Sequence, residues 1–420
     1  MAAAGKKPLL LVFPFGLLSH YLRSLILCRY LKNYFEIKVA NNPAFNSFIT
    51  QEAFASFECD SLNADCIIKA MKKFDFSWLN TSDLENVFEQ QVKTIRDMRP
   101  FAVLGDHSIT LKMAAEAAGV VYISLVNGYM SKYYDGIREI SRMHPAYPFV
   151  KLLPESLTRV VTKQGEAAAF RLIHRSFKSL RKKHDLSRQT SYLDEMEGDL
   201  TLVCDLPAFF PQTNLPNDYF QLAPLFYTPP CSHEQFFPSP MPGKKIIFVS
   251  MGSSGDWEKI TFLNHPFFEK YNVIASGDTE RVLCAPHISH VSFVDITAVF
   301  PLTDLVICHG GNGTIYQSLL YEIPVLCYPS HCEQEWNVAV LEKHNLAKSL
   351  HGIMHPDTLI SITEEWIGRK GSPVFNAYRE KISSETDRLP GMVETVATAI
   401  IRKGQQKSRI SKETYETLEV

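Results

Sequence analysis

Several features that mark particular protein classes are missing from this chain of 420 residues. Its nine cysteines include no CxxC pair and no closely spaced framework, which argues against a small disulfide-stapled domain and predicts reduced thiols in a cytoplasmic protein. The formal net charge of −2 gives no overall field that attracts nucleic acid, so the composition argues against a dedicated DNA- or RNA-binding protein.

Long apolar runs are missing as well. No stretch approaches the roughly 18–20 apolar residues that a membrane-spanning helix needs. The run Leu9–Phe15 follows two lysines, like the start of a signal peptide, but Pro14 and Gly16 interrupt it and no A-x-A cleavage site follows. The sequence therefore predicts an intracellular protein without a transmembrane segment.

Two motifs of cofactor-dependent enzymes are also absent. A nicotinamide dehydrogenase needs GxGxxG directly after its first strand, whereas the first strand here runs into FPFGLLSH. No D-x-D motif is present to hold a divalent cation on a diphosphate, and the pair His287 and His290 by itself is too small a ligand set for a metal site. We therefore predict neither a metal ion nor an organic cofactor.

The chain is long enough for two domains, because single cores stop growing at roughly 250–300 residues. Short apolar runs that end in Gly, Asp, Ser or Asn alternate with helix-like segments in both halves, which predicts an α/β protein with doubly wound, Rossmann-like parallel sheets. A proline-rich stretch at 227–245 predicts the linker. We place the first domain at 1–238, the second at 239–400 and a polar tail at 401–420.

The strongest motif is HGGNGTIYQSLLYEIPVLCYPS, which begins at His309. A strand (Leu305–Cys308) runs into a glycine-rich turn and then into a helix predicted to begin near Thr314. The first turn of a helix offers unpaired N–H groups and the positive end of its dipole, which suits a diphosphate. Taken alone, the glycines are equally well explained by a tight strand-to-helix turn.

With these residues, the chain resembles the UDP-glycosyltransferase superfamily, the inverting enzymes of GT-B fold that include plant natural-product and bacterial macrolide glycosyltransferases. The resemblance implies that His309, Gly311, Gly313 and Thr314 contact the donor diphosphate. Gln317 stands where the family usually has the glutamate that grips the ribose hydroxyls. A glutamine can accept through its oxygen, but the paired acceptors of a carboxylate are lost.

Further donor contacts follow from the resemblance. PSHCEQEWN fits a family element that binds the hydroxyls of the donor sugar, whereas SFVD lies at the nucleobase position and FVSMGSS at a phosphate-facing turn. The phenylalanine of SFVD is also explained as a core aromatic, and many serine-glycine turns bind nothing. The residues that these three segments contribute are Ser253, Ser254, Phe293, Val294, Glu333 and Gln334.

The first half supplies the predicted chemistry. FPFGLLSHYLRS fits the G-H-x-x-P opening of the family, with His20 on the catalytic histidine and Arg23 in place of proline. An imidazole with a pKa near 6.5 is suited to take the proton of an acceptor hydroxyl, so we predict His20 as general base. Asp106 ends the strand-like run PFAVLGD and is its predicted partner, because strand ends meet at one sheet edge. An isolated histidine is more often a capping or core residue.

One segment, Arg171–His184, interleaves six Arg or Lys residues with apolar ones. A solvated helix whose apolar stripe packs on the domain explains it best. Weak contact with an anionic membrane that carries a lipid-like acceptor is the alternative.

Together these observations predict an inverting glycosyltransferase that moves a sugar from a UDP- or dTDP-type donor to a hydroxyl, or a similar nucleophile, of a small, apolar or aromatic acceptor. The first domain would bind the acceptor and the second the nucleotide sugar, with catalysis in the cleft between them. A non-catalytic GT-B partner protein and a nucleotide-sugar epimerase are the alternatives.

Overall fold

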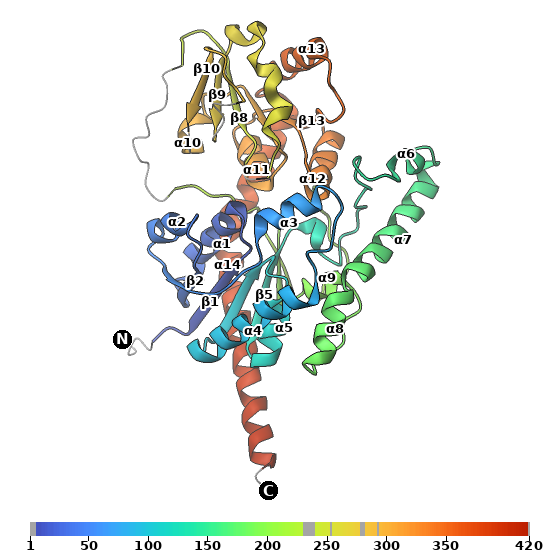
Figure 1. The fold of residues 1–420 in the computed structure, drawn as a ribbon. Helices are drawn as coiled ribbons and strands as arrows, with labels where there is room; N and C mark the ends of the chain where they lie inside the picture. The colour runs from blue at the N-terminus through green and yellow to red at the C-terminus, as the bar shows by residue number, and fades with distance from the viewer. Residues whose placement is uncertain (1–5, 230–239, 253, 278–281, 292–293, 419–420) are drawn as a thin grey trace. The chain divides into compact units, whose positions relative to one another are not determined.

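The computed structural model describes residues 6–229, 240–252, 254–277, 282–291 and 294–418, with the side chains of 410–418 left out. The chain divides into two compact units: residues 1–225 together with 387–420, and residues 226–386. Each unit is built around one parallel sheet, as the alternating sequence pattern predicts (Figure 1).

The sheet of the first unit has seven strands in the order β3-β2-β1-β4-β5-β6-β7, all of them parallel. Its central strands are continuous apolar runs, because helices cover both faces of a parallel sheet. The strands are β1 (Leu9–Pro14), β2 (Glu36–Ala40), β3 (Ala55–Phe57), β4 (Ala102–Asp106), β5 (Val121–Val126), β6 (Leu200–Cys204) and β7 (Tyr219–Leu222). The short edge strands β3 and β7 were not among the predicted strands.

The helices of the first unit alternate with its strands along the chain. They are α1 (Leu18–Leu31), α2 (Asn46–Gln51), α3 (Ala64–Met71), α4 (Thr81–Met98), α5 (Leu111–Ala118), the short 3₁₀ turn η1 (Gly128–Met130), α6 (Tyr147–Val150), α7 (Glu155–Ile173), α8 (Arg175–Lys183) and α9 (Tyr192–Glu195). α4 shows why such segments fold: Asn80 caps its first turn, and its apolar residues recur at helical spacing on the buried face.

The second unit has a six-stranded parallel sheet in the order β10-β9-β8-β11-β12-β13. Its strands are β8 (Ile246–Ser250), β9 (Asn272–Ser276), β10 (Ile288–Val291), β11 (Leu305–Cys308), β12 (Val325–Cys327) and β13 (Ala347–Ser349). The strand β13 escaped prediction because its sequence, AKS, carries no apolar run. The helices are η2 (Trp257–Asn264), η3 (Pro266–Lys270), α10 (Ile296–Val299), α11 (Asn312–Leu320), α12 (Cys332–Lys343) and α13 (Pro356–Ile367).

The last helix, α14 (Pro373–Leu418), corrects the predicted boundaries. The first unit ends at Leu225 rather than 238, and residues 387–420 return to it instead of forming the end of the second domain and a tail. Lys403 and Lys407 explain this return, because their amino groups lie 2.9 Å from Asp218 and 2.7 Å from Asp199 of the first unit. Among the described helices, none is both long and apolar enough to cross a membrane.

Candidate active site

The predicted histidine and aspartate of the first unit lie in contact. His20 is in the first turn of α1, directly after β1, and Asp106 is the last residue of the adjacent strand β4. The register places Pro14 opposite Asp106, so both residues lie at the carboxyl edge of the sheet. The distance between His20 Nδ1 and Asp106 Oδ1 is 2.8 Å.

This contact indicates which nitrogen of the neutral imidazole carries the proton. Asp106 is completely buried, whereas the His20 side chain is 15% exposed. A carboxylate oxygen accepts, so Nδ1 donates and Nε2 of the neutral ring is left with its lone pair. Two further rings surround His20, with the centroids of Phe15 and His107 at 5.6 Å and 5.7 Å.

Arg23 joins this pair, a contact that the sequence analysis missed. It lies one turn after His20 on α1, and its Nε donates to Asp106 Oδ2 at 2.8 Å while Nη2 contacts Oδ1. Nη1 donates to the side-chain oxygen of Asn127 at 2.7 Å. The i, i+3 spacing of His20 and Arg23 was the available indication, because it places both on one helix face.

The charge of Arg23 decides the state of Asp106. Burial by itself would raise the pKa of the Asp106 carboxyl, but Arg23 and then His20 hold this pKa well below its usual range. The pKa of Arg23 is in turn raised, since Asp106 more than offsets the effect of burial. Asp106 is therefore an anion shared between a permanent cation and the imidazole.

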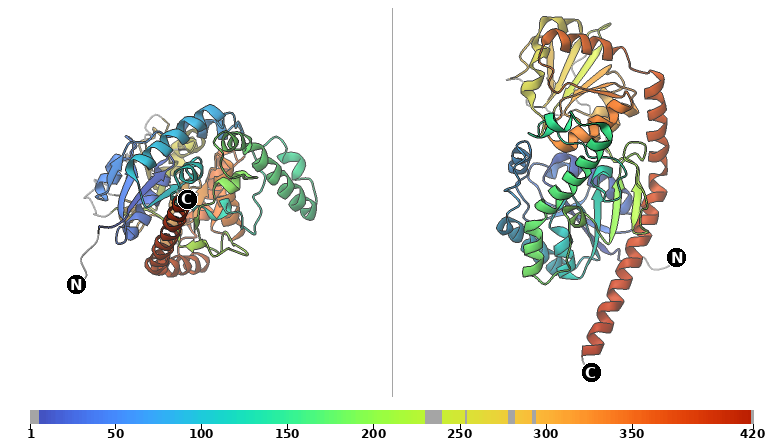
Figure 2. Two further views of the ribbon diagram at one scale, coloured as in Figure 1. Left: turned by 90° about the horizontal axis from the view of Figure 1, so that it is seen from below. Right: turned by 90° about the vertical axis from the view of Figure 1, so that its right-hand side faces the viewer.

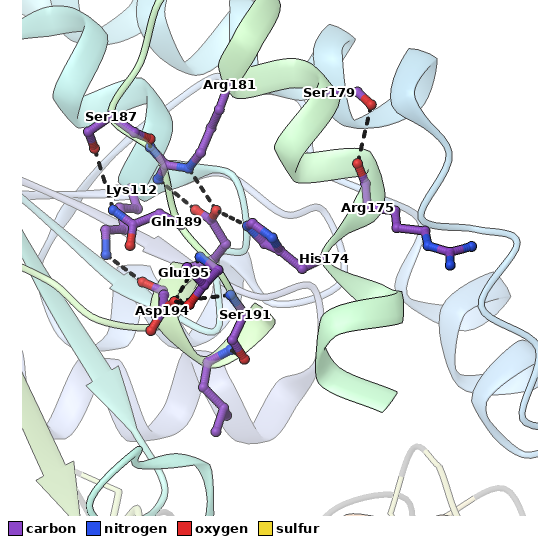
Figure 3. A network of polar contacts seen from close by, with 12 residues as sticks. Lys112, His174, Arg175, Ser179, Arg181, Ser187, Gln189, Ser191, Asp194 and Glu195 are labelled. Atoms are coloured by element: carbon purple, nitrogen blue, oxygen red, sulfur yellow. Dashed lines mark hydrogen bonds and ion pairs between the residues drawn. The ribbon is translucent and has the colours of Figure 1, made fainter. Parts of the chain in front are cut away.

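A second histidine–carboxylate pair lies elsewhere in the first unit, where no motif predicted it. His174 Nε2 is 2.8 Å from Glu195 Oε1, and Arg181 contacts both oxygens of Glu195 at 2.7 Å (Figure 3). The Arg181 Nη1 group also donates to Glu116 of α5 at 2.8 Å. The side chains of His174 and Glu195 are only 3% and 0% exposed, so this network joins α8 to α5 and α9 rather than meeting a substrate.

Part of the basic segment 171–184 packs on the domain beside this network. Phe177 and Leu180 of α8 are completely buried, whereas Leu172 at the end of α7 is 55% exposed, so the apolar stripe of the segment packs on the domain through α8 alone. The apolar side chains of α8 are therefore not available to a membrane.

In the second unit, the glycine-rich turn connects β11 to α11 as the motif predicts. The helix begins at Asn312, slightly before the expected start at Thr314, and its N-cap Gly311 supplies no side-chain hydrogen bond. The N–H groups of the first helical turn, which include those of Gly313 and Thr314, therefore have no acceptor within α11. Such a turn suits an anion.

Glycines allow two loops to meet at His309. A Cβ atom on Gly252, which has a φ of +55°, would lie 2.6 Å from the His309 ring, and one on Gly311 would lie 2.5 Å from its Nε2. Any side chain at either position would displace the imidazole. The turn after β8 and the turn after β11 are therefore packed directly around His309.

The predicted sugar-binding residues lie at the start of α12. Gln334 is buried and donates to Ser254 Oγ at 2.8 Å, while its oxygen accepts from the backbone and hydroxyl of Ser330 at 2.8 Å and 2.9 Å. Gln334 thus ties α12 to two loops, those of Ser254 and Ser330. Glu333 lies beside it in the first turn of α12 and is partly exposed.

The contact that Gln317 makes accounts for the glutamine that stands here in place of the family glutamate. Gln317 is buried on α11, and its Nε2 donates to the backbone oxygen of Tyr227 at 2.8 Å. A glutamate at 317 would place a carboxylate oxygen against this backbone oxygen, and both atoms are acceptors. Of the two residues predicted near the nucleobase, Val294 is buried, whereas Phe293 lies outside the described residues. Ser253 lies outside them as well.

Asn337 is a further residue that the motif contains but to which no role was given. It is buried on α12, and its Nδ2 donates to the backbone oxygen of Gly310 at 3.2 Å. Gly310 has a φ of +90°, and a Cβ there would meet Val338 at 2.7 Å. The helix α12 therefore holds the glycine turn in place.

Known proteins are similar to this chain in both sequence and fold. Residues 243–383 match the glycosyltransferase family 28 C-terminal domain. A PGL/p-HBAD biosynthesis glycosyltransferase of Mycobacterium tuberculosis (strain ATCC 25177 / H37Ra) is 24% identical over 352 residues, covering 81% of this chain and 80% of its own. The chain is a glycosyltransferase of the GT-B type.

Solved structures of glycosyltransferases share the fold of the whole chain. VinC in complex with dTDP superposes with a TM-score of 0.64 at 18% identity, over 95% of this glycosyltransferase and 100% of VinC. The spinosyn rhamnosyltransferase SpnG gives a TM-score of 0.63 at 16% identity, over 93% and 99%. The predicted two-sheet GT-B fold is confirmed.

Proposed function

We propose that this glycosyltransferase moves a sugar from a nucleotide-diphosphate donor to the hydroxyl of a small, apolar or lipid-like acceptor, with inversion at the anomeric carbon. The contact between His20 and Asp106 carries the proposal. It gives one unit a base whose ring is oriented by an anion, which is what deprotonation of an alcohol needs.

The chemical step is a single displacement. The acceptor proton passes to His20 Nε2 as the acceptor oxygen forms its bond to the anomeric carbon. The bond from that carbon to the diphosphate oxygen breaks, and its electron pair leaves with the nucleotide. Asp106 balances the imidazolium that forms, because its charge lies 2.8 Å from Nδ1.

The second unit receives the leaving group in this proposal. The uncapped first turn of α11 and the imidazole of His309 supply fixed donors for the diphosphate, with Gly311, Gly313 and Thr314 on that turn. The dTDP bound to VinC and the names of the mycobacterial relatives support a dTDP or UDP donor and a natural-product-like acceptor. The proposed role of Glu333 and Gln334 toward the donor sugar rests on the resemblance of PSHCEQEWN to the family element.

The test is turnover of His20→Ala. With a panel of UDP- and dTDP-sugars and phenolic acceptors, mass spectrometry of the product should show kcat reduced by about 10²–10⁴, the usual contribution of a general base. Donor affinity measured by calorimetry should be unchanged, because the donor residues lie in the second unit. His355→Ala, an exposed histidine of that unit, is the matched control.

Unchanged turnover in His20→Ala would contradict the assignment of the base. A wild-type chain that binds nucleotide but transfers and epimerises nothing would instead favour the non-catalytic partner, and epimerised donor without transfer would favour the epimerase.

A further inference from the structure

The helix α7 carries its apolar side chains on the face that points away from the protein. Leu157, Val160, Val161 and Leu172 are 46%, 51%, 37% and 55% exposed. Val160 and Val161 follow Leu157 by three and four residues, and Leu172 follows Val161 by eleven. At this spacing all four lie on one side of the helix. A surface helix normally shows the reverse arrangement, so this exposed stripe needs an explanation.

The opposite side of α7 holds the helix in this orientation. Thr162 is buried there, and Glu166 accepts a hydrogen bond from Arg138. Farther along, the ring of Phe170 lies 5.7 Å from the Arg138 guanidinium and stacks on Tyr192 with centroids 6.2 Å apart. The apolar stripe is therefore fixed outward by contacts on the other side.

The exposed apolar surface continues at the far end of α7. Phe149 of α6 and Leu152 are 73% and 83% exposed. Figures 1 and 2 show that α6 and α7 project from the part of the first unit that surrounds its sheet. We call these six residues the α7 face: Phe149, Leu152, Leu157, Val160, Val161 and Leu172.

Exposed cations outnumber exposed anions along the segment that carries this face. Between 147 and 183, one acidic residue, Glu155, is exposed, and Glu166 is engaged with Arg138. The exposed basic residues of the same segment are Lys151, Arg159, Lys163, Arg171, Arg175, Lys178, Lys182 and Lys183, of which Lys183 is paired with Glu85. Helical spacing places Arg171 on the apolar side of α7, and Arg159 and Lys163 toward the opposite side. Apolar side chains flanked by Lys and Arg are typical of helices that lie in the interface of an anionic bilayer.

We propose that the α7 face docks on an anionic lipid surface. Its apolar side chains enter the boundary between headgroups and acyl chains, and the flanking cations meet lipid phosphates. A second copy of the chain fits this face less well, because a two-fold contact brings the same basic residues of both copies together. The proposal is independent of the sugar chemistry, since vesicle binding is measured without donor or acceptor.

The experiment is flotation of the full chain with vesicles of neutral phosphatidylcholine, and with vesicles in which about a third of the lipid is anionic phosphatidylglycerol. The wild-type chain should float with the anionic vesicles and less so as salt is raised. The double variant Val160→Gln and Leu172→Gln should partition roughly tenfold or more weakly, because two apolar anchors are lost. Leu302→Gln with Met354→Gln changes two apolar residues of the second unit that are at least as exposed, at 51% and 84%, and should float like wild type.

Charge is tested separately with Lys151→Glu and Arg171→Glu, whose matched control is Lys69→Glu with Lys93→Glu at exposed positions of α3 and α4. The first pair should abolish the preference for anionic vesicles, and the second should leave it. Unaltered circular dichroism keeps a folding defect from imitating the result. Wild-type chain that ignores anionic vesicles, or a Gln double variant that binds as wild type does, would overturn the proposal. A dimer that this variant dissociates, without vesicle binding, would also overturn it.

Discussion

The two units of this glycosyltransferase stabilise their buried polar groups in different ways. The first unit buries charges and pairs them: Asp106 with Arg23, and Glu195 with Arg181. In the second unit, the hydrogen bonds near the glycine turn join neutral amides and hydroxyls, such as Gln334 with Ser254. An anion held beside an imidazole serves proton transfer, whereas neutral donors suit hydrogen bonds to an incoming diphosphate. The chemistry proposed for each unit thus matches the electrostatics of its interior.

Removing a charge from the first unit should give the largest effect. Asp106→Asn leaves Arg23 buried without its counter-ion, and breaking such a pair costs about 3–5 kcal/mol of unfolding free energy. Loss of the anion behind His20 should also reduce kcat by roughly 10³–10⁴. Denaturant melts and product formation measure the two effects.

The matched change in the second unit is Gln334→Ala. It removes neutral hydrogen bonds and should cost only about 1–3 kcal/mol. If both variants lose the same stability, the contrast between the units is wrong.

Glu195→Gln should separate stability from catalysis. The variant removes the anion that Arg181 and His174 share, so we expect a loss of about 3 kcal/mol in unfolding free energy. The network has no contact with His20, and kcat measured well below the melting temperature should therefore stay within about twofold, since unrelated sites act independently. The control is Glu364→Gln, whose exposed pair with Lys270 should contribute at most about 1 kcal/mol. A large fall in kcat would tie the network to catalysis.

As the pH falls, the free energy of unfolding of the first unit should decrease before that of the second. Burial opposes ionisation of Asp106 and Asp194, yet paired cations and hydrogen bonds lower their pKa values, that of Asp194 to about 2. A carboxyl whose pKa is depressed by folding stabilises the protein above its unfolded pKa of about 4, and this stability is lost as pH falls toward the folded pKa. Glu116 and Glu195 shift in the same direction and also belong to the first unit.

We therefore expect the unfolding free energy of the first unit to fall by roughly 2 kcal/mol more than that of the second between about pH 5 and pH 3. Pulsed hydrogen exchange at one fixed labelling pH, read by peptide mass spectrometry, assigns each transition to its unit. Loss of the second unit first would contradict this expectation.

The sequence predicted the elements that depend on local pattern. Apolar runs ending in small or polar residues located the central strands, and strand ends brought His20 and Asp106 together. Arg23 escaped prediction because its role depends on the direction of a long side chain across the sheet edge. The pairing of His174 with Glu195, and the return of α14 to the first unit, depend on contacts between residues far apart in the chain. Such contacts leave no periodic trace in the sequence.

Gln317 offers the finest comparison, because one atom distinguishes it from the family glutamate. Its amide donates to the backbone oxygen of Tyr227, so Gln317→Glu should cost about 1–2 kcal/mol by setting acceptor against acceptor. We also expect UDP and dTDP to bind the wild-type chain within about threefold, since a glutamine lacks the paired acceptors that hold both ribose hydroxyls. Thermal melts and calorimetry with both nucleotides measure these differences. Gln317→Met, which removes the donor without adding an acceptor, is the control and should lose less stability than the glutamate. A tenfold gain in UDP affinity for Gln317→Glu at unchanged stability would show instead that the Tyr227 contact yields readily and that position 317 is tuned for the ribose.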